Sequence, residues 1–353
     1  MNRETVVDEL GEAGTAFAQD DYFKIDPEAH LVGRMETLEH FPGVRMWWKA
    51  IDNIRRPLLL GMPAEALEGL APDDLQKNDD PEALLAAMDR YGVDLACLLP
   101  ESMMDTTGYS TRWVTNGDMA LVVERHPDRF LYQPNLSPIL HRGVKNAIWE
   151  LEYWVKEKDA RIFKFYPPED TYINDPGLWP FYERAEALGI VLDIHTGFCW
   201  VPPGKSKHAL PLLLDDVARD FPGLRIVAFH MGYPYTDDLN MVAMGHPNVH
   251  VCLSLLVPWA LSAPRKFARI LGEALRWVGP DRIIWGTDCA GFGAQIATAV
   301  RGLREFQIPE DLREGYGYPE ITDDDRRKIF GLNLARLIGI EPKRRVGASK
   351  VTS

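Results

Sequence analysis

Apolar, β-branched-rich runs recur along the whole chain, each followed by a stretch with helical character. The runs are continuous rather than alternating, which predicts strands buried on both faces, as in a parallel sheet. Eight such strands alternating with helices predict a (β/α)8 barrel, the TIM-barrel fold. The expected strands cover residues 22–26, 93–99, 129–134, 161–166, 189–195, 225–230, 249–255 and 282–288.

The helical stretches carry their own start and stop signals. Residues 79–92 open with acidic residues and Pro81 and end in glycine, which suits the dipole and the caps of a helix. Near the C-terminus, Thr322 begins a stretch that we expect to close the barrel. We predict a single barrel domain over residues 1–342, followed by a polar, solvated tail over 343–353. The last helix has apolar residues at helical spacing: Ile329, Phe330, Leu334 and Leu337.

One connection is too long for an ordinary loop between a strand and a helix. It is an insertion of about residues 31–78 after the first strand, and we expect it to pack as a subdomain or lid. The insertion follows His30 directly, so Arg45, Trp47 and Trp48 could contact an aromatic, anionic ligand. Alternatively, the tryptophans pack the insertion onto the barrel or form a subunit contact.

Charge and composition narrow the classes of function. The chain has 353 residues, a net charge of −13 and 46% hydrophobic residues, enough for a large core. An acidic chain has no general attraction for nucleic acid or anionic membranes, so we exclude both as partners. No apolar run reaches the roughly 20 residues of a membrane span, and the polar N-terminus is not a secretory signal. Four cysteines without CxxC spacing are typical of reduced thiols, so we expect a cytoplasmic protein.

Five potential metal ligands stand at the ends of apolar runs: Glu28, His30, His195, His230 and Asp288. Because the carboxyl ends of barrel strands meet at one rim, these side chains are candidates for a single site. Carboxylates and imidazoles without thiolates suit zinc or manganese. Each residue also has a structural interpretation, such as a surface glutamate, a core histidine or a helix-capping aspartate. The five together favour one metal centre.

Lys164 ends another expected strand, in the sequence IFKFYPP. A carbamylated lysine bridging two metal ions is possible there, but the other ligands favour a site for one ion. Lys164 could then contact the substrate or hold a strand-end carboxylate. We include it among the candidate substrate-binding residues, together with Phe198 and Phe292.

The order of these motifs resembles the amidohydrolase superfamily, in its amidohydrolase-related decarboxylase branch. That branch includes decarboxylases of γ-resorcylate, 5-carboxyvanillate and aminocarboxymuconate semialdehyde. The resemblance runs from about Phe23 to Ile340. Many members carry HxH on the first strand, and the ExH of this chain is similar to the γ-resorcylate type. The motifs are KIDPEAH, FKFYPP, LWPFYERAEALGIVLDIHTG, FHMGYPYTDD, RIIWGTDC and GLNLARLIGI.

The resemblance implies that Glu28, His30, His195 and Asp288 bind one divalent ion, Zn²⁺ or Mn²⁺. It places His230 beside the ion as a substrate-contacting or proton-handling residue. The family also implies a homodimer or homotetramer.

The implied reaction is metal-dependent, non-oxidative decarboxylation of a hydroxylated aromatic, benzoate-like acid. Asp288 would deliver a proton to the ring carbon that carries the carboxylate. The alternative enzyme is a metal-dependent hydrolase of an amide, lactone or ester, in which Asp288 would take a proton from water. A barrel that uses the metal only for stability is disfavoured, because structural zinc sites usually have four protein ligands and are often rich in sulfur.

Overall fold

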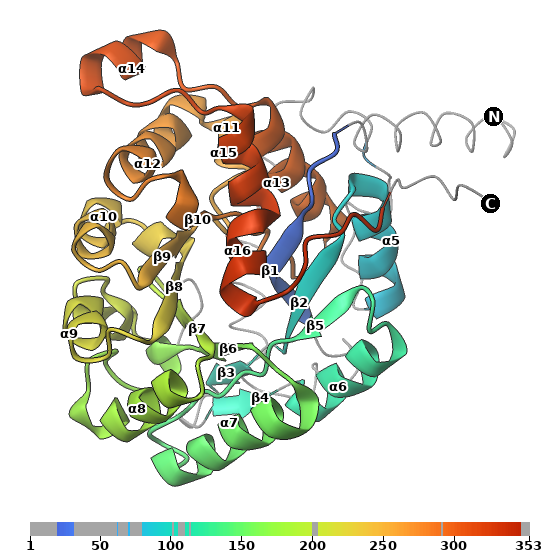
Figure 1. Ribbon diagram of the computed structural model, residues 1–353, viewed down its shortest axis with the longest axis vertical. Coiled ribbons are helices and arrows are strands. Elements are labelled where there is room, and N and C mark those ends of the chain that lie inside the picture. Colours follow the sequence, from blue (N-terminus) through green and yellow to red (C-terminus); the bar gives the residue numbers. More distant parts are fainter. Residues whose placement is uncertain are drawn as a thin grey trace, which may run out of the picture.

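The computed structural model describes residues 20–31, 62, 70, 80–100, 102–104, 110–112, 114–199, 204–290 and 292–346. Within these residues, eight parallel strands form a barrel that is surrounded by helices (Figure 1). The predicted TIM-barrel fold is therefore confirmed. The strands are β1 (Ile25–Leu31), β2 (Leu95–Pro100), β5 (Phe130–Tyr132), β6 (Ile162–Phe165), β7 (Val191–His195), β8 (Arg225–Phe229), β9 (Val249–Cys252) and β10 (Ile283–Ile284).

The barrel consists of two parallel sheets joined at both edges. One sheet has the order β1-β2-β5 and the other β10-β9-β8-β7-β6. Parallel bridges link Ala29 to Cys289 and Asn135 to Lys164. Backbone hydrogen bonds support both junctions, with His30 N 2.8 Å from Cys289 O and Lys164 N 3.0 Å from Pro134 O. These contacts join the sheets into one circle.

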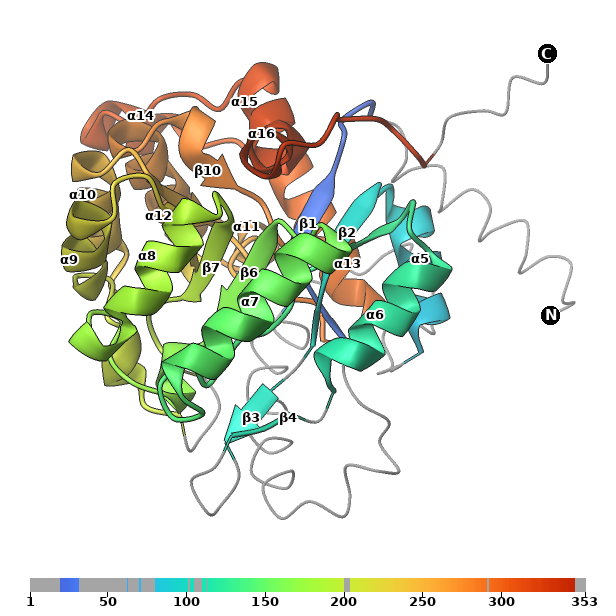
Figure 2. The ribbon, with the colours of Figure 1, turned by 60° about the horizontal axis from the view of Figure 1, so that its bottom comes forward.

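The helices lie outside the strands, as two views show (Figures 1 and 2). The α-helices are α5 (Pro81–Tyr91), α6 (Asn116–Arg125), α7 (Val144–Lys158), α8 (Trp179–Ala187), α9 (Leu213–Asp220), α10 (Thr236–Gly245), α11 (Trp259–Ser262), α12 (Pro264–Trp277), α13 (Gly293–Glu305), α14 (Glu310–Tyr316), α15 (Asp323–Arg327) and α16 (Asn333–Ile338). Short 3-10 helices cover Pro167–Glu169, Pro176–Leu178, Ser206–Ala209, His230–Gly232 and Pro280–Arg282. A π-helical turn, Lys328–Leu332, connects α15 to α16. The predicted start of α5 is confirmed, since the Asp80 side chain accepts from Glu82 N.

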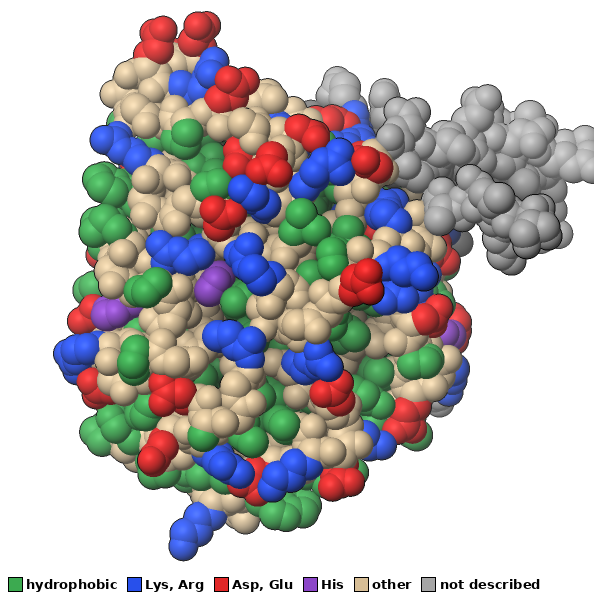
Figure 3. Space-filling model, viewed as in Figure 1, with side chains coloured by type: hydrophobic (Ala, Val, Ile, Leu, Met, Phe, Trp, Pro, Cys, Tyr) green, Lys and Arg blue, Asp and Glu red, His purple; other side chains and the backbone are tan. Residues whose placement is uncertain are grey.

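The segment from α15 to α16 closes one end of the barrel, as predicted. Thr322 forms a capping box with Asp325 at its start. Arg161 and Arg225 donate to the last carbonyl groups of α16, where the helix dipole favours a cation. The buried side chains of α16 pack with inward-facing strand residues, among them Ile25, Leu95, Ile162, Val191, Val227 and Ile284. On the face that carries α16, basic and acidic side chains are interspersed (Figure 3).

Two strands differ most from their predicted bounds. Strand β1 covers Ile25–Leu31 rather than 22–26, because its second half pairs with β2 on one side and with Cys289 on the other. Strand β10 is only Ile283–Ile284, because Trp285 N bonds to Ile329 O instead of a neighbouring strand. In addition, a short antiparallel hairpin, β3 (Ser102–Met104) with β4 (Ser110–Arg112), follows β2 and was not predicted.

The predicted insertion and tail are described only in part. Of residues 31–78, the structure describes Leu31, Met62 and Leu70, so the insertion lies almost entirely outside the described residues. The described part of the tail is exposed or half-buried, and its backbone at Arg345 and Val346 donates to the Asp94 carboxylate. None of the described helices is long and apolar enough to span a membrane.

Candidate metal centre

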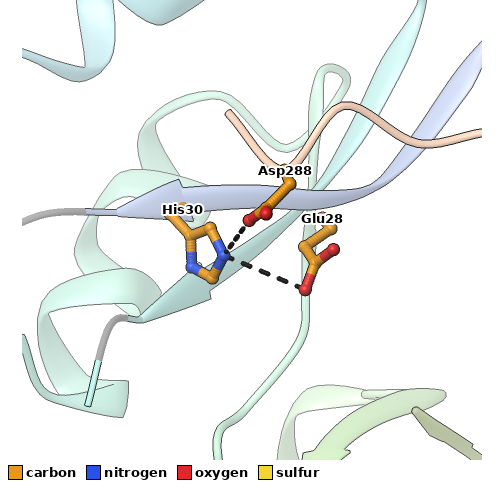
Figure 4. A group of neighbouring side chains, drawn as sticks. All are labelled: Glu28, His30 and Asp288. Atoms are coloured by element: carbon orange, nitrogen blue, oxygen red, sulfur yellow. Dashed lines mark hydrogen bonds and ion pairs between the residues drawn. The ribbon is translucent and has the colours of Figure 1, made fainter. Parts of the chain in front are cut away.

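Three side chains meet at the carboxyl-terminal rim of the barrel (Figure 4). Glu28 and His30 are two residues apart on β1 and therefore share a face of the strand. Asp288 joins them from the segment after β10, which is bridged to β1 through Cys289. His30 Nε2 is 2.9 Å from Asp288 Oδ1 and 3.9 Å from Glu28 Oε1. One ligand atom from each residue lies within 4.8 Å of the others, a spacing that a single ion could bridge.

The backbone around Asp288 is held in an uncommon conformation. Asp288 has a φ of 55°, which is unfavourable for a residue other than glycine and needs support from its surroundings. Buried Asp26 supplies part of that support, because it accepts hydrogen bonds from the backbone and the hydroxyl of Thr287. Gln295 Nε2 donates to Asp288 O at 3.0 Å. Sequence reasoning missed Asp26, although a second carboxylate two residues before Glu28 was a usable signal.

Burial and neighbouring charges shift the pKa values of Glu28 and Asp288 in opposite directions. Burial raises the pKa of Glu28, but the charges of Lys164, His230 and His30 outweigh it and hold that pKa below its usual value. Burial, with the nearby charge of Glu28, raises the pKa of Asp288. The site therefore combines an ionised carboxylate with a second carboxyl group that holds a proton more readily.

Lys164 lies deeper in the barrel, between two buried carboxylates. Its Nζ is 2.8 Å from Glu28 Oε1 and 3.1 Å from Asp193 Oδ1. The other oxygen of Asp193 accepts from Gln133 Nε2 at 2.7 Å. Burial lowers the pKa of Lys164, but attraction to Asp193 and Glu28 outweighs it and raises the pKa overall. The ammonium is thus paired with carboxylates, and its predicted contact with substrate stays a prediction.

Asp193 was not among the predicted site residues. It stands two residues before His195 in β7, so the two side chains share the inward face of the strand. A lone carboxylate inside an apolar run was the signal that could have identified it.

The two strand-end histidines lie side by side, with ring centroids 4.6 Å apart. His230 Nε2 is 3.7 Å from Glu28 Oε1. Its Nδ1 is 3.4 Å from the carbonyl oxygen of Ser254 and 3.1 Å from the hydroxyl. Since a carbonyl oxygen only accepts, Nδ1 carries a hydrogen, and this contact holds the ring with Nε2 on the Glu28 side.

Within the described part of the chain, His195 is not a member of the group formed by Glu28, His30 and Asp288 but lies beside it. Its Nε2 is 3.4 Å from Phe198 O, and its ring packs edge-on against Tyr166. Burial, with the charges of His230 and Lys164, lowers its pKa well below the usual value. The imidazole is therefore neutral, the form that binds metals, and its role as a ligand stays a prediction.

The predicted substrate-binding residues other than Lys164 differ in how exposed they are and in whether the structure describes them. Phe198 follows β7 and its side chain is 47% exposed, whereas Phe292 is buried at the start of α13. Their contact with substrate stays a prediction. Arg45, Trp47 and Trp48 lie outside the described residues.

A divalent ion fits the Glu28, His30 and Asp288 group. Among the described residues, the buried Glu28 Oε2 has no hydrogen-bond partner, a costly state that a nearby cation would relieve. The donors are carboxylate oxygens and an imidazole nitrogen, as zinc and manganese accept. The group also lies at the rim where barrel enzymes place their active sites.

Comparison with known families agrees with this fold. A family model described as Amidohydrolase matches residues 25–340, from the first strand to the end of the closing helix. The chain belongs to this amidohydrolase family, whose members are enzymes.

Individual relatives are distant. Protein fluG of Emericella nidulans is 29% identical over 118 residues, which are 32% of this chain and only 13% of that protein. A 5-carboxyvanillate decarboxylase from Novosphingobium aromaticivorans, solved with manganese and 4-hydroxy-3-methoxy-5-nitrobenzoic acid, has 16% identity and a TM-score of 0.59 over 92% of this chain and 97% of its own. The 4-oxalomesaconate hydratase of Rhodopseudomonas palustris has 20% identity and a TM-score of 0.56 over 90% and 96%. At these identities the two structures share the fold.

Proposed function

We propose that this protein catalyses the metal-dependent, non-oxidative decarboxylation of a hydroxylated aromatic, benzoate-like acid. The observation that carries the proposal is the convergence of Glu28, His30 and Asp288 at the rim of an amidohydrolase barrel. Further support comes from the 5-carboxyvanillate decarboxylase, which has the same fold and was solved with manganese and a nitro-substituted hydroxybenzoate.

Glu28, His30 and Asp288, joined by the predicted ligand His195, would hold one Zn²⁺ or Mn²⁺ ion. When bound, the ion supplies Lewis-acid chemistry that holds the carboxylate and an ortho hydroxyl group of the substrate. Ionised Glu28 contributes negative charge to the ion, and the neutral ring of His195 offers a lone pair. These residue types do not distinguish zinc from manganese.

Asp288 is the proton donor of the proposed reaction. Its carboxyl group transfers a proton to the ring carbon that bears the carboxylate and regains one from water after each turnover. The bond between that carbon and the carboxylate then breaks, its electron pair restores the aromatic ring, and carbon dioxide leaves. His230 Nε2, held by the contacts of Nδ1 with Ser254, orients the substrate.

The second candidate is metal-dependent hydrolysis of an amide, lactone or ester at the same site. The 4-oxalomesaconate hydratase on the same fold favours water chemistry as the alternative. In that reaction Asp288 would accept a proton from water instead of giving one to carbon. The two candidates differ in their products, since only decarboxylation releases carbon dioxide.

One purified sample tests the proposal. Bound metal is measured by elemental analysis, and the same sample is incubated with a panel of ortho-hydroxylated aromatic acids while carbon dioxide release is followed. We expect about one zinc or manganese ion per chain and carbon dioxide from at least one acid. Bound metal with no carbon dioxide from any acid would favour the hydrolase. A protein that neither contains nor takes up metal would contradict both candidates.

A further inference from the structure

The amine of Lys164 is buried among three groups, two acidic side chains and an aromatic ring. Its side chain is 3% exposed and donates to Glu28 Oε1 and Asp193 Oδ1. The face of the Phe229 ring lies 4.2 Å from Nζ, a cation–π distance. The ammonium is therefore fixed in position.

Asp193 completes a buried chain of polar contacts from the barrel interior to the metal centre. It has no exposed surface, and its two oxygens accept from Lys164 Nζ and Gln133 Nε2. The chain runs from Gln133 through Asp193 and Lys164 to Glu28, with links of 2.7, 3.1 and 2.8 Å. Such a chain couples the position of one side chain to the next, because each link holds a polar atom of one member against its neighbour.

The charges along this chain explain why Asp193 is needed. A lysine paired with Glu28 alone would draw that carboxylate away from a bound ion and would leave a buried positive charge beside it. Asp193 accepts a second hydrogen bond from the amine, so Lys164 is held between the two side chains rather than by Glu28 alone. Since Lys164 donates to two carboxylates, its nitrogen also has no free lone pair with which to form a carbamate.

We propose that Asp193 is a positioning residue of the metal centre, which acts through Lys164 to hold Glu28 in the orientation that binds a single ion. This inference rests on the metal centre of the proposed function but not on the substrate or on the reaction. Partners of metal ligands commonly change metal affinity by about 10- to 100-fold when they are replaced.

The test is a double-mutant cycle on metal affinity. Metal-free protein is titrated with Mn²⁺ alone, and free Mn²⁺ is followed by electron paramagnetic resonance. We expect Asp193→Asn to weaken Mn²⁺ binding by about tenfold in the native background and by less than about twofold in a Lys164→Met background. Wild-type affinity in Asp193→Asn, or the same loss in both backgrounds, would overturn the proposal.

Asp94→Asn is the matched control. Asp94 is also a fully buried aspartate, but it lies just before β2 at the opposite end of the barrel. We expect this variant to bind Mn²⁺ as the native protein does, even if its melting temperature falls. Melting temperatures of all variants, measured without metal, separate a loss of folding from a loss of metal affinity.

A second measurement needs no variant and therefore no assumption about folding. The native protein is loaded with Mn²⁺ with and without added bicarbonate, and the bound ions are counted. We expect one ion per chain in both conditions. Uptake of a second ion that requires bicarbonate would show that Lys164 is carbamylated and bridges two ions, which would overturn the proposal. Failure to release carbon dioxide from aromatic acids, by contrast, would affect only the proposed function.

Discussion

At the scale of single residues, Glu28 and Asp288 show how one site can give two carboxyl groups different chemistry. Both belong to the metal centre, where Glu28 is buried and Asp288 is half-buried, but only Glu28 lies beside the ammonium of Lys164. Its pKa is lowered, whereas burial and the charge of Glu28 raise the pKa of Asp288. The pair thus offers one permanent anion and one group that can carry a proton.

The first prediction concerns Asp288 as proton donor. We expect Asp288→Asn to lower kcat for decarboxylation by about 10²- to 10⁴-fold, because the amide has no acidic proton to give. Carbon dioxide release is measured per bound metal ion, so that lost metal is not counted as lost chemistry. Activity near the native level in the metal-loaded variant would remove Asp288 from this role.

The second prediction concerns His250 on β9, which lies outside the metal centre. Burial, with the nearby charge of Arg282, lowers its pKa to about 4. The unfolded chain, with a histidine pKa of about 6.5, therefore takes up a proton first as the pH falls. We expect the free energy of unfolding to drop between about pH 6.5 and pH 4, by up to about 3 kcal/mol from this residue.

Urea denaturation across this pH range checks the prediction. His250→Gln should show a smaller loss of unfolding free energy toward low pH than the native protein. Identical slopes for the two proteins would contradict the assignment of the effect to His250.

At the scale of elements, the segment from α15 to α16 begins with a capping box formed by Thr322 and Asp325. The hydroxyl of Thr322 accepts from Asp325 N, and the Asp325 side chain accepts from Thr322 N. The same arrangement begins α6, where Thr115 pairs with Asp118. Each capping box satisfies backbone N–H groups that have no partner within the helix.

The third prediction follows from this cap. We expect Thr322→Ala to lower the free energy of unfolding by about 1 kcal/mol, measured by chemical denaturation. Thr322→Ser keeps the hydroxyl and should stay within a few tenths of a kcal/mol of the native protein. An equal loss in both variants would show that the methyl group, rather than the cap, is responsible.

At the scale of the whole molecule, Asp94 ties together parts of the chain that are far apart in sequence. Its carboxylate accepts from Lys24 N, before β1, and from Arg345 N and Val346 N near the C-terminus. It has no exposed surface, so these donors replace the water that it loses on folding. The first and last described segments of the chain are thereby joined beside β2.

The fourth prediction is that Asp94→Ala lowers the free energy of unfolding by about 3 kcal/mol, because the buried N–H of Lys24 and two partly buried N–H groups of the tail lose their acceptor. Deletion of residues 343–353 should be less damaging, since Lys24 N keeps its bond. The two changes together should cost less than the sum of their separate effects, because they remove shared contacts. Strict additivity in thermal and urea unfolding would contradict the coupling.

The barrel and the residue types at its rim follow from the amino-acid pattern alone. Continuous apolar runs such as those around Val191 and Ile226 identify buried parallel strands, because strands covered on both faces have no polar side to display. Their spacing places His195 and His230 at neighbouring strand ends. The closing segment was predictable too, since a helix cap is a local interaction.

How the rim residues are paired could be seen only once the chain was folded. Lys164 lies between Glu28 and Asp193 because of the register of β1, β6 and β7. These three strands bring the carboxyl groups of Glu28 and Asp193 within 3.1 Å of the Lys164 amine. The left-handed backbone at Asp288 likewise depends on Asp26, 261 residues before Thr287. Periodicity shows which face of a strand is buried, but contacts between distant strands arise from the closed packing of the whole barrel.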